Sequence, residues 1–419
     1  MREMKDSEIE WIGAIPAAWG VHRIASHFQE VKEKNTANEY SNALQFKMGR
    51  IIAKPQKWDE EEINEIYAAY TVVHPNTIMI NGLNLEFDFV TQRVAQVECD
   101  GIITSAYIAL SPRDDINAKY ICYLLKSYDA CRAFHSMGRG LRKILSFSEL
   151  KNKPIIVPPL AEQGRIAAFL DAECAEVDAV LEKTRASIDE YKKLKQAVIT
   201  QAVTKGIRGD RPMKDSGIEW IGEIPKSWGI NTIFQLCTQV KNKNVELIEN
   251  NLLSLSYGKI KRKNIDAVEG LLPESFDGYN IIEKDDIVLR LTDLQNDHTS
   301  LRVGISEERG IITSAYLTIR NRSNFIPKYL YYYLHSFDIS KGFYGMGAGV
   351  RQSLNWDGLK WLKVITPSRE EQEQIAEFLN TKCTEIDNLI SKKEQYITEI
   401  ENYKKSLIYE YVTGKKEVI

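Results

Sequence analysis

The chain repeats itself, because its two halves match at a constant shift of 209 residues. Residues 4–19 (MKDSEIEWIGAIPAAW) match residues 213–228 (MKDSGIEWIGEIPKSW) at 12 of 16 positions. The same shift sets GIITSAY at 101–107 on GIITSAY at 310–316. A fixed period reports a duplicated structural unit. The sequence therefore predicts two related domains, and 419 residues are also too many for one core.

Between the shared blocks the two halves diverge. When residues 41–100 are set on residues 250–309, only 14 of 60 positions are identical. The two predicted domains therefore share a framework and differ in the middle of each repeat.

Composition excludes several classes of protein. No stretch approaches 18 consecutive apolar residues, and no apolar segment of signal-peptide type follows the charged start MREMKDSEIE. We therefore expect a cytoplasmic protein without a membrane partner. The net charge of −3 argues against an indiscriminate nucleic-acid coat but leaves room for a local basic face. The six cysteines form no C-x-x-C pair, so we expect reduced, mostly buried thiols and no metal site.

Each half ends in a long charged segment with helical periodicity. Apolar residues alternate at spacings of four and three, which is typical of a narrow coiled-coil seam. The first seam comprises Val177, Leu181, Thr184, Ile188, Tyr191, Lys195 and Val198. The second comprises Ile386, Ile390, Lys393, Ile397, Ile400, Lys404 and Leu407. Because two matched seams in one chain meet at high effective concentration, we expect the helices to pack against each other.

The ends of these helices have recognisable signals. Ser368 to Glu371 predicts a capping box that opens the second helix, and Gly206, with Pro212 beyond it, predicts the end of the first. Two starts are open for the first helix. A start at Glu162 gives about 66 Å of helix and a start at Cys174 gives about 48 Å. We predict a break near Asp171 and thus the shorter helix.

The segments before each helix contain short apolar runs bounded by Gly, Pro, Asn and Asp, which predict strands. They lie at 77–80, 101–110, 155–157, 286–291, 310–319 and 364–365. Helical patterns at 118–127 and 327–336 are interleaved with them. Each unit is therefore predicted to be a mixed α and β (α+β) domain of about 160 residues.

Catalytic signatures are missing from the sequence. The chain has no G-x-x-x-x-G-K-[ST] phosphate loop and no Asn-Pro-Pro-Tyr-like motif of adenine methylation. The segment from Val157 to Leu160 is predicted to be extended backbone that precedes the helix. Gly345-x-Gly347-x-Gly349 carries Val350 where a dinucleotide loop needs its third glycine. We therefore predict no catalytic and no metal-binding residue.

Basic and amide side chains provide candidates for contact with DNA. Guanidinium and amide groups in glycine-rich backbone can meet phosphate oxygens, and Asn, Gln and Arg suit base edges. For each group the alternative is a solvated turn or a solvated charged face. The candidates are Arg50, Lys54, Lys57, Asn81, Asn84, Arg93, Arg139, Arg142, Lys143, Lys259, Lys261, Arg262, Lys263, Arg290, Gln295, Asn296, His298, Arg302 and Arg351.

The blocks W-I-G-x-I-P-x-x-W, G-I-I-T-S-A-Y, M-G-x-G-x-R and P-x-x-E-Q-x-x-I-A-x-F-L resemble those of the specificity (DNA-recognition) subunit of type I restriction-modification systems. Each block occurs twice, and the resemblance covers essentially the whole chain. The last block departs slightly, since its second copy has one more residue between Pro367 and Gln372.

The resemblance implies two pseudo-twofold-related target-recognition domains, at 1–160 and 208–368, separated by two long antiparallel helices at 161–207 and 369–419 that form a coiled coil. It implies a non-catalytic subunit that binds double-stranded DNA, two methyltransferase subunits and two motor-nuclease subunits. S-adenosylmethionine, ATP and Mg would be bound by those partners and not by this chain. Because the middles of the repeats differ, the expected DNA target is bipartite and asymmetric.

Two other functions remain open at this stage. The chain could be the reading portion of a self-sufficient restriction-methylation enzyme, although the methylase motif is missing. It could also be a tandem scaffold whose domains bind protein or glycan.

Overall fold

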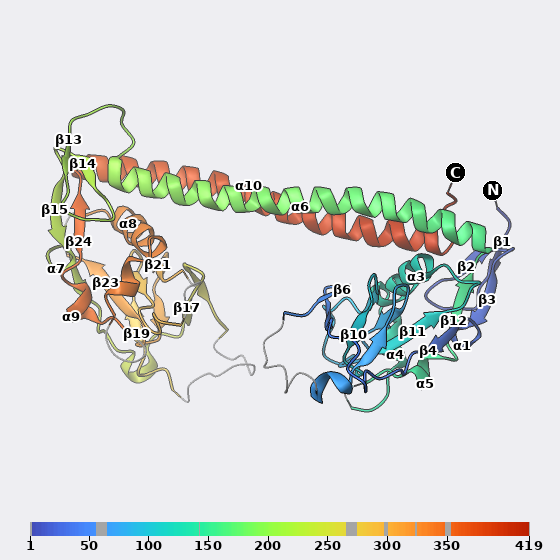
Figure 1. The fold of residues 1–419 in the computed structure, drawn as a ribbon. Coiled ribbons are helices and arrows are strands. Elements are labelled where there is room, and N and C mark those ends of the chain that lie inside the picture. The colour runs from blue at the N-terminus through green and yellow to red at the C-terminus, as the bar shows by residue number, and fades with distance from the viewer. Residues whose placement is uncertain are drawn as a thin grey trace. The chain divides into compact units, whose positions relative to one another are not determined.

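The computed structural model (Figure 1) describes residues 2–55, 65–141, 143–264, 275–296, 301–322, 325–347 and 353–418. It divides into two compact units. Unit 1 comprises Met1–Thr184 with Glu394–Ile419, and unit 2 comprises Arg185–Lys393. The two boundaries fall at positions that are equivalent under the 209-residue shift. Each unit therefore contains the globular part of one repeat, the start of that repeat's long helix, and the end of the other repeat's helix.

Unit 1 is built from short antiparallel strands and short helices. Its four-stranded sheet has the order β4 (Phe28–Glu30), β11 (Ile108–Pro112), β8 (Ile78–Ile80) and β9 (Val94–Gln96). The paired strands are β1 (Met4–Asp6) with β2 (Ala14–Pro16), β3 (Gly20–Arg23) with β12 (Pro154–Val157), β5 (Leu44–Lys47) with β6 (Arg50–Ala53), and β7 (Thr71–Val73) with β10 (Gly101–Ile103). The short helices are α1 (Ile24–His27), α3 (Ala118–Ala130), α4 (Ala133–Met137) and α5 (Phe147–Leu150).

Unit 2 repeats this plan strand for strand. Its sheet has the order β16 (Cys237–Gln239), β23 (Leu317–Asn321), β20 (Ile287–Leu289) and β21 (Val303–Ile305). The pairs are β13 (Met213–Asp215) with β14 (Glu223–Pro225), β15 (Gly229–Thr232) with β24 (Lys363–Thr366), β17 (Leu253–Ser256) with β18 (Lys259–Arg262), and β19 (Asn280–Ile282) with β22 (Gly310–Ile312). The helices are α7 (Ile233–Leu236), η1 (Val245–Leu247), α8 (Pro327–Ile339), η2 (Gly342–Gly345) and α9 (Trp356–Leu359).

The divergent middles keep one topology. A parallel bridge joins Ala43 to Ile102 in unit 1, and the equivalent bridge joins Leu252 to Ile311 in unit 2. Low identity in this region has therefore changed side chains without changing the order of the strands. The mixed helix and strand fold predicted from the sequence is confirmed.

One predicted run is two strands. The segment 101–110 divides into β10 and β11 because Thr104 to Tyr107 form a turn, in which the Tyr107 amide donates to the Thr104 carbonyl over 3.5 Å. The equivalent segment of unit 2 divides in the same way into β22 and β23. The shared GIITSAY block is thus a strand followed by a turn and the approach to a second strand.

A buried tyrosine, on α3 in unit 1 and on α8 in unit 2, fixes the end of the partner helix in each unit. In unit 1 the Tyr120 hydroxyl donates to the Val412 carbonyl over 3.0 Å. In unit 2 the equivalent Tyr329 hydroxyl donates to the Val203 carbonyl over 3.2 Å. Both tyrosines are fully buried, and burial raises the pKa of each hydroxyl well above its ordinary value. They therefore act as neutral donors.

The second tryptophan of the W-I-G-x-I-P-x-x-W block fixes the start of each unit's own helix. Trp19 Nε1 donates to Glu162 over 3.1 Å, and Trp228 Nε1 donates to Glu371 over 2.7 Å. Arg2 and Arg211 pair with these two carboxylates in units 1 and 2 respectively. The two sequence blocks lie far apart in each repeat, and these contacts hold them together.

The long helices are α6 (Leu160–Lys205, 46 residues) and α10 (Arg369–Val412, 44 residues). The predicted break near Asp171 is wrong, since α6 continues through it. Leu170 and Cys174 on either side are buried in the core of unit 1, and the Tyr123 hydroxyl donates to Asp171 over 2.9 Å. Packing against α3 therefore holds this part of the helix, and the 46 residues correspond to about 69 Å.

The predicted helix ends are confirmed, with one difference. Gly206 follows α6 with φ of 81°, and its amide donates to the Ala202 carbonyl. At the start of α10 the Glu371 amide donates to Ser368 Oγ over 3.3 Å. The Glu371 carboxylate, however, binds Trp228 and Arg211 and does not complete the capping box.

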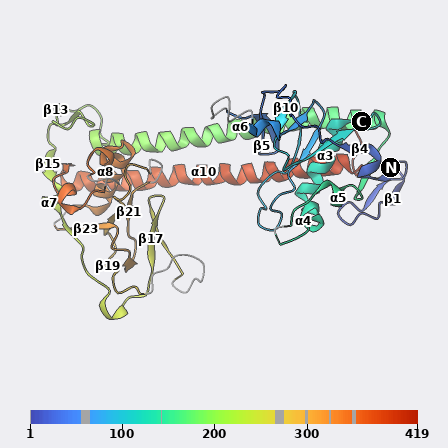
Figure 2. The same cartoon turned by 60° about the horizontal axis from the view of Figure 1, so that its bottom comes forward.

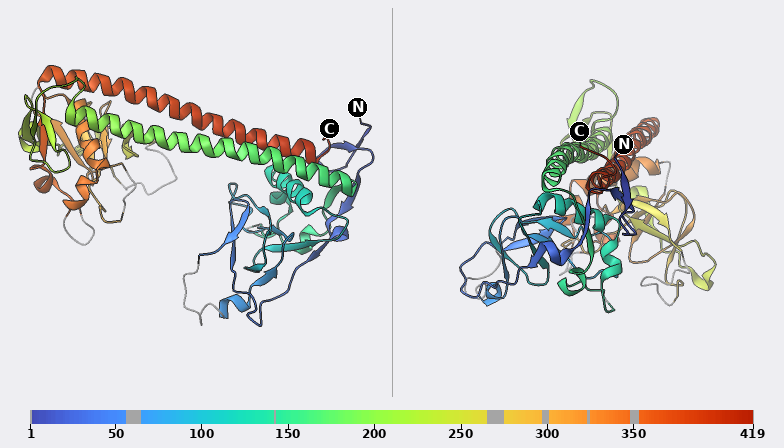
Figure 3. Two further views of the ribbon diagram at one scale, coloured as in Figure 1. Left: turned by 45° about the horizontal axis from the view of Figure 1, so that its top comes forward. Right: turned by 90° about the vertical axis from the view of Figure 1, so that its right-hand side faces the viewer.

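The predicted seams are confirmed, since every seam residue is buried or half-buried. In unit 1 the Lys404 ammonium donates to Asp178 over 2.6 Å, and in unit 2 Lys195 donates to Asp387 over 2.7 Å. Within each unit the helix segments are therefore antiparallel partners, which lie side by side in Figures 2 and 3.

Four of the six cysteines are buried, namely Cys122, Cys174, Cys237 and Cys383. Desolvation raises the pKa of each of these thiols, to about 12 for Cys237. Over the described residues, no helix is long and apolar enough to cross a bilayer.

Candidate nucleic-acid interface

Three segments of unit 1 that carry predicted DNA contacts lie against one another. They are the β5–β6 hairpin, the β8–β9 loop (81–93) and the glycine loop (138–145). A Cβ on Gly49 of the hairpin would lie 2.5 Å from the Gln92 side chain of the β8–β9 loop. The Leu145 amide of the glycine loop donates to the Gly82 carbonyl over 2.8 Å. Segments separated by up to about 100 residues thus form one surface.

Unit 2 forms the equivalent surface from the β17–β18 hairpin, the β20–β21 loop (290–296 and 301–302) and residues 353–354 after the second glycine block. A Cβ on Gly258 would lie 3.1 Å from Leu301, and the Leu354 amide donates to the Leu291 carbonyl over 2.9 Å. Each contact has its counterpart in unit 1 at the 209-residue shift. The arrangement is therefore a property of the repeat.

Each hairpin ends in a two-residue turn with left-handed backbone. Met48 and Gly49 have φ of 48° and 70°, and Tyr257 and Gly258 have φ of 47° and 74°. Two positive φ values in succession are typical of the type I′ turn, which matches the twist of the flanking strands. A two-stranded ribbon fits the major groove of DNA, so the hairpins have a suitable form for contact with base edges.

The hairpin of unit 2 is the more basic. Lys259, Lys261 and Lys263 are exposed on it. Arg262 is also exposed, but its Nε donates to Glu308 over 2.8 Å. This contact raises the pKa of Arg262 and lowers that of Glu308, so both groups stay charged. The three lysines are thus the stronger candidates for phosphate contact.

The hairpin of unit 1 carries fewer cations. Arg50 is exposed and lies 3.7 Å from the Asp178 carboxylate of α6. Lys54 is half-buried, and its ammonium lies 5.8 Å from the centre of the Tyr70 ring. Both side chains belong to the surface, but each already has a neighbour within unit 1.

The interpretation of Arg93 and Arg302 as base readers is wrong. Both side chains are fully buried. Arg93 Nη1 donates to the Asn81 and Leu83 carbonyls over 3.1 and 2.7 Å, and Nη2 donates to the Asp88 carbonyl over 2.7 Å. A guanidinium that is committed to backbone oxygens inside the loop cannot present an edge to a base.

Arg302 performs the same task in unit 2. Its Nη1 donates to the Arg290 and Thr292 carbonyls over 3.0 and 2.9 Å. The backbone amides of Arg93 and Arg302 donate to Asp129 and Asp338 over 2.7 and 2.6 Å. Because unpaired buried carbonyls are costly, each arginine stabilises the shape of its loop. These arginines are positioning residues.

The loops around these arginines carry the amide candidates. Asn81 and Arg290 are half-buried where each loop begins, and the Asn81 carboxamide oxygen accepts from the Leu83 amide over 3.1 Å. Asn84 is exposed in left-handed backbone with φ of 60°. Gln295 and Asn296 are exposed in unit 2, and Asn296 Nδ2 donates to Asp293 over 2.8 Å.

The glycine loop of unit 1 presents two basic candidates. The Arg139 side chain is 81% exposed, with Nε 4.0 Å from Glu149. Hydrogen bonds from Ser146 and Ser148 lower the pKa of Glu149 to about 2, so this carboxylate remains charged. Lys143 pairs with Glu86 of the β8–β9 loop at 2.6 Å. Lys57, Arg142, His298 and Arg351 lie outside the described residues.

The charge-based sequence reasoning missed the apolar residues of this surface. Met48, Phe87, Val90 and Leu141 are 63%, 73%, 83% and 97% exposed on the three segments of unit 1. The sequence contained a signal for these residues. Phe87, Phe89 and Val90 lie between Asn84 and Gln92, in a segment whose polar residues predict a loop. Apolar residues in such a loop indicate a contact surface.

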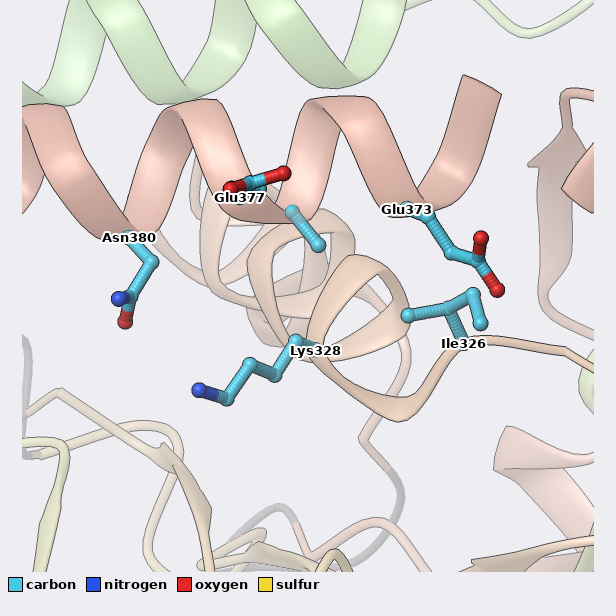
Figure 4. A pocket seen from close by; sticks show the side chains of 6 residues that line it. Ile326, Lys328, Glu373, Glu377 and Asn380 are labelled. Carbon is cyan, nitrogen blue, oxygen red and sulfur yellow. The ribbon is translucent and has the colours of Figure 1, made fainter. Parts of the chain in front are cut away.

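A shallow pocket elsewhere in unit 2 has no features of a catalytic centre. Lys328 and Ile326 at the start of α8 face Glu373, Glu377 and Asn380 of α10 (Figure 4). Lys328 and both carboxylates belong to the open surface of these helices. In the part of the chain that the structure describes, no group of three His, Cys, Asp or Glu residues could hold a metal ion.

The chain is similar to known proteins. The family model described as the type I restriction modification DNA specificity domain matches residues 99–188 and 231–402. The type I restriction enzyme MjaVIII specificity subunit of Methanocaldococcus jannaschii is 26% identical over 96% of this chain and 94% of its own length. The putative type I restriction enzyme MjaX specificity subunit of the same organism is 23% identical over 97% of this chain and 96% of its own length.

A solved structure has the same fold. A chain from work on complex assembly and conformational transition of the type I R-M system aligns with a TM-score of 0.71 at 13% identity. The alignment covers 96% of this chain and 99% of that chain.

Proposed function

Because the chain belongs to the family of type I restriction modification DNA specificity domains, we propose that it is a non-catalytic subunit that reads a bipartite, asymmetric DNA target. One observation carries the proposal. Unit 1 brings together its hairpin, its β8–β9 loop and its glycine loop, and unit 2 in the same way brings together its hairpin, the described part of its β20–β21 loop and residues 353–354. We call these segments the reading surface of each unit. The exposed side chains of the two reading surfaces differ. Equivalent backbones would bind the duplex in the same manner, while unlike side chains would select different bases.

The long helices support a role in docking partners. Val180, Tyr396 and Tyr403 are 41%, 50% and 55% exposed in unit 1, although they lie on helices whose seams are already filled. At equivalent positions of unit 2, Leu389 and Leu194 are 42% and 49% exposed. Residues seven apart share one helix face, so Leu389, Tyr396 and Tyr403 form a second apolar stripe on α10. The matching stripe on α6 contains Val180 and Leu194 and is interrupted by Ser187.

We propose that these stripes bind helices of two methyltransferase subunits. Two motor-nuclease subunits would then join that assembly. S-adenosylmethionine, ATP and Mg would be held by those partners, since this sequence carries none of the motifs that bind them.

The test is to map methylated adenines in cells with and without this gene, expressed beside its methyltransferase partner. We expect a bipartite motif with two unlike halves to disappear when the gene is deleted. An unchanged methylation pattern would refute the proposal, and methyl transfer by the purified chain alone would show an enzyme instead.

The helix pair would set the spacing between the two halves of the target. A matched deletion of residues 182–188 and 391–397 removes one heptad from each helix and keeps both seams in register. Seven residues correspond to about 10 Å of helix, or about three base pairs of spacer. Methylation mapping should show a shorter spacer with both halves unchanged. An unaltered spacer would contradict this role of the helices.

A further inference from the structure

Apolar side chains are concentrated on the reading surface of unit 1. Its most exposed members are Leu141 of the glycine loop, Val90 and Phe87 of the β8–β9 loop and Met48 of the hairpin turn, and Phe89, Ile144 and Ile52 on the same segments are exposed as well. Single exposed apolar residues need no explanation, but several on adjoining segments mark a contact site. The same segments carry exposed Arg50 and Arg139, which suit a polyanion.

The backbone around Phe87 and Val90 is fixed. The Asp88 carboxylate accepts from the Val90 and Thr91 amides over 3.1 and 2.9 Å, and the Asp88 carbonyl accepts from Arg93. These bonds hold the turn between the two apolar residues. Phe87 and Val90 are therefore presented to solvent by an ordered loop instead of folding into the core.

The aromatic ring between them has a different role. The Phe89 ring stacks on His135 with centres 5.1 Å apart and planes at 8°, and the Arg132 guanidinium lies 5.1 Å from its centre. Phe89 therefore anchors the loop to α4 and its N-cap. Phe89 is still 56% exposed, whereas Phe87 and Val90 on either side are 73% and 83% exposed and are the more accessible apolar groups of the loop.

Unit 2 differs at the equivalent positions. Asn296 stands where unit 1 has Phe87, and Tyr257, with its hydroxyl, stands where unit 1 has Met48. The sequence places Thr299 at the position of Val90. Thus the two loops share a buried arginine but differ in side-chain chemistry at these positions of the sequence.

The major-groove edge of DNA offers one apolar group, the 5-methyl group of thymine. The other groups that distinguish the base pairs there are hydrogen-bond donors and acceptors, which would lose their water without a replacement under an apolar side chain. Building on the proposed function, we propose that unit 1 recognises thymine methyl groups in its half-site through apolar contact with Phe87 and Val90.

The test uses the full chain with its methyltransferase partner and a duplex that carries the mapped motif. Deoxyuridine replaces thymidine in one half-site at a time, which deletes only the methyl group. Burial of one methyl group is worth about 0.8 kcal/mol, so affinity should fall about fourfold per contacted methyl in the unit 1 half-site. The unit 2 half-site should not respond to the loss of methyl groups in this way.

Variants assign the effect to the loop. The double variant Phe87→Asn with Val90→Thr, which takes the residues of unit 2, should bind thymidine and deoxyuridine duplexes equally. Both side chains are exposed, so we expect little change in stability. Phe234→Ser is the matched control, because Phe234 is an exposed aromatic residue of unit 2 outside its reading surface.

Each outcome of these measurements either supports or overturns the proposal. A methyl effect that disappears in the double variant supports the proposal. Deoxyuridine without effect in either half-site, an effect that persists in the double variant, or a unit 1 half-site without A·T pairs would each overturn it. Lower affinity of the double variant without any methyl effect would indicate insertion between base pairs and would also overturn it. Absence of any sequence-specific binding would instead refute the proposed function.

Discussion

Unit 1 and unit 2 have one backbone plan and two different surfaces. Several residues that are identical between them at the reading surface are buried, as Arg93 and Arg302 are, whereas many exposed positions, such as Phe87 and Asn296, differ. At this surface, residues that are identical in both repeats thus position the loops, and residues that differ are the ones that recognise DNA. A basic residue that is shared by both repeats is a poor candidate for specificity.

The largest expected effect is on DNA binding by one unit, after removal of its buried arginine. Arg93→Met or Arg302→Met leaves buried carbonyls unpaired, which costs about 1–3 kcal/mol for each unsatisfied group. Gel-shift titrations should show DNA binding weakened by about a hundredfold, as two such groups would produce, with selectivity lost only in the half-site of the altered unit. Arg113→Met, at an exposed arginine of unit 1, is the control. Equal loss of both half-sites would contradict the independence of the units.

The units should also respond differently to acid. His335 of α8 is buried near Lys195, and desolvation lowers its pKa to about 4, whereas unit 1 has Lys126 at this position. Folding thus favours the neutral imidazole. The contribution of neutral His335 to the free energy of unfolding of unit 2 is fully present above the ordinary histidine pKa of about 6.5. It falls as the pH drops toward 4, by at most about 1.4 kcal/mol per pH unit.

Denaturant titrations between about pH 4.5 and 7.5 span this window and measure the loss of stability. His335→Gln should flatten the pH dependence of the unfolding of unit 2, while the substitution Lys126→Gln should have no such effect on unit 1. The same acid slope in His335→Gln as in the parent chain would show that other groups dominate.

A smaller effect should test the equivalence of the helix seams. Lys404→Glu in unit 1 and Lys195→Glu in unit 2 each replace a half-buried attraction by repulsion. We expect about 1 kcal/mol of destabilisation in each unit. Adding Asp178→Lys to Lys404→Glu should restore only part of it, because Asp178 also faces Arg50. Full restoration in thermal unfolding would show that Arg50 contributes nothing.

The smallest expected difference concerns salt. Alanine at Lys259, Lys261 and Lys263 should weaken binding for all duplexes alike, and the logarithmic salt slope should decrease by about 0.9 for each phosphate that is no longer neutralised. Alanine at Arg50 and Lys54 should change the slope less, since these cations already have partners within unit 1. Equal slopes for the two sets would contradict the contrast between the hairpins.

The duplication, the mixed α and β class, the seam residues and the end of α6 at Gly206 could all be predicted from the amino-acid sequence. These features follow from periodicity and from local backbone preference, which are encoded in neighbouring residues. Methylation and nucleotide-binding motifs could likewise be searched for directly, because their chemistry requires fixed short spacings.

Which candidates share a surface, and which are buried, became clear only from the three-dimensional structure. Arg93 had the same sequence signature as an exposed reader, but burial and three backbone carbonyls make it a support for its loop. The continuity of α6 through Asp171 depends on α3, which lies about 50 residues earlier in the chain. Long-range packing overrides local pattern in both places, because burial of a charge or of a helix turn depends on partners that no local window of sequence contains.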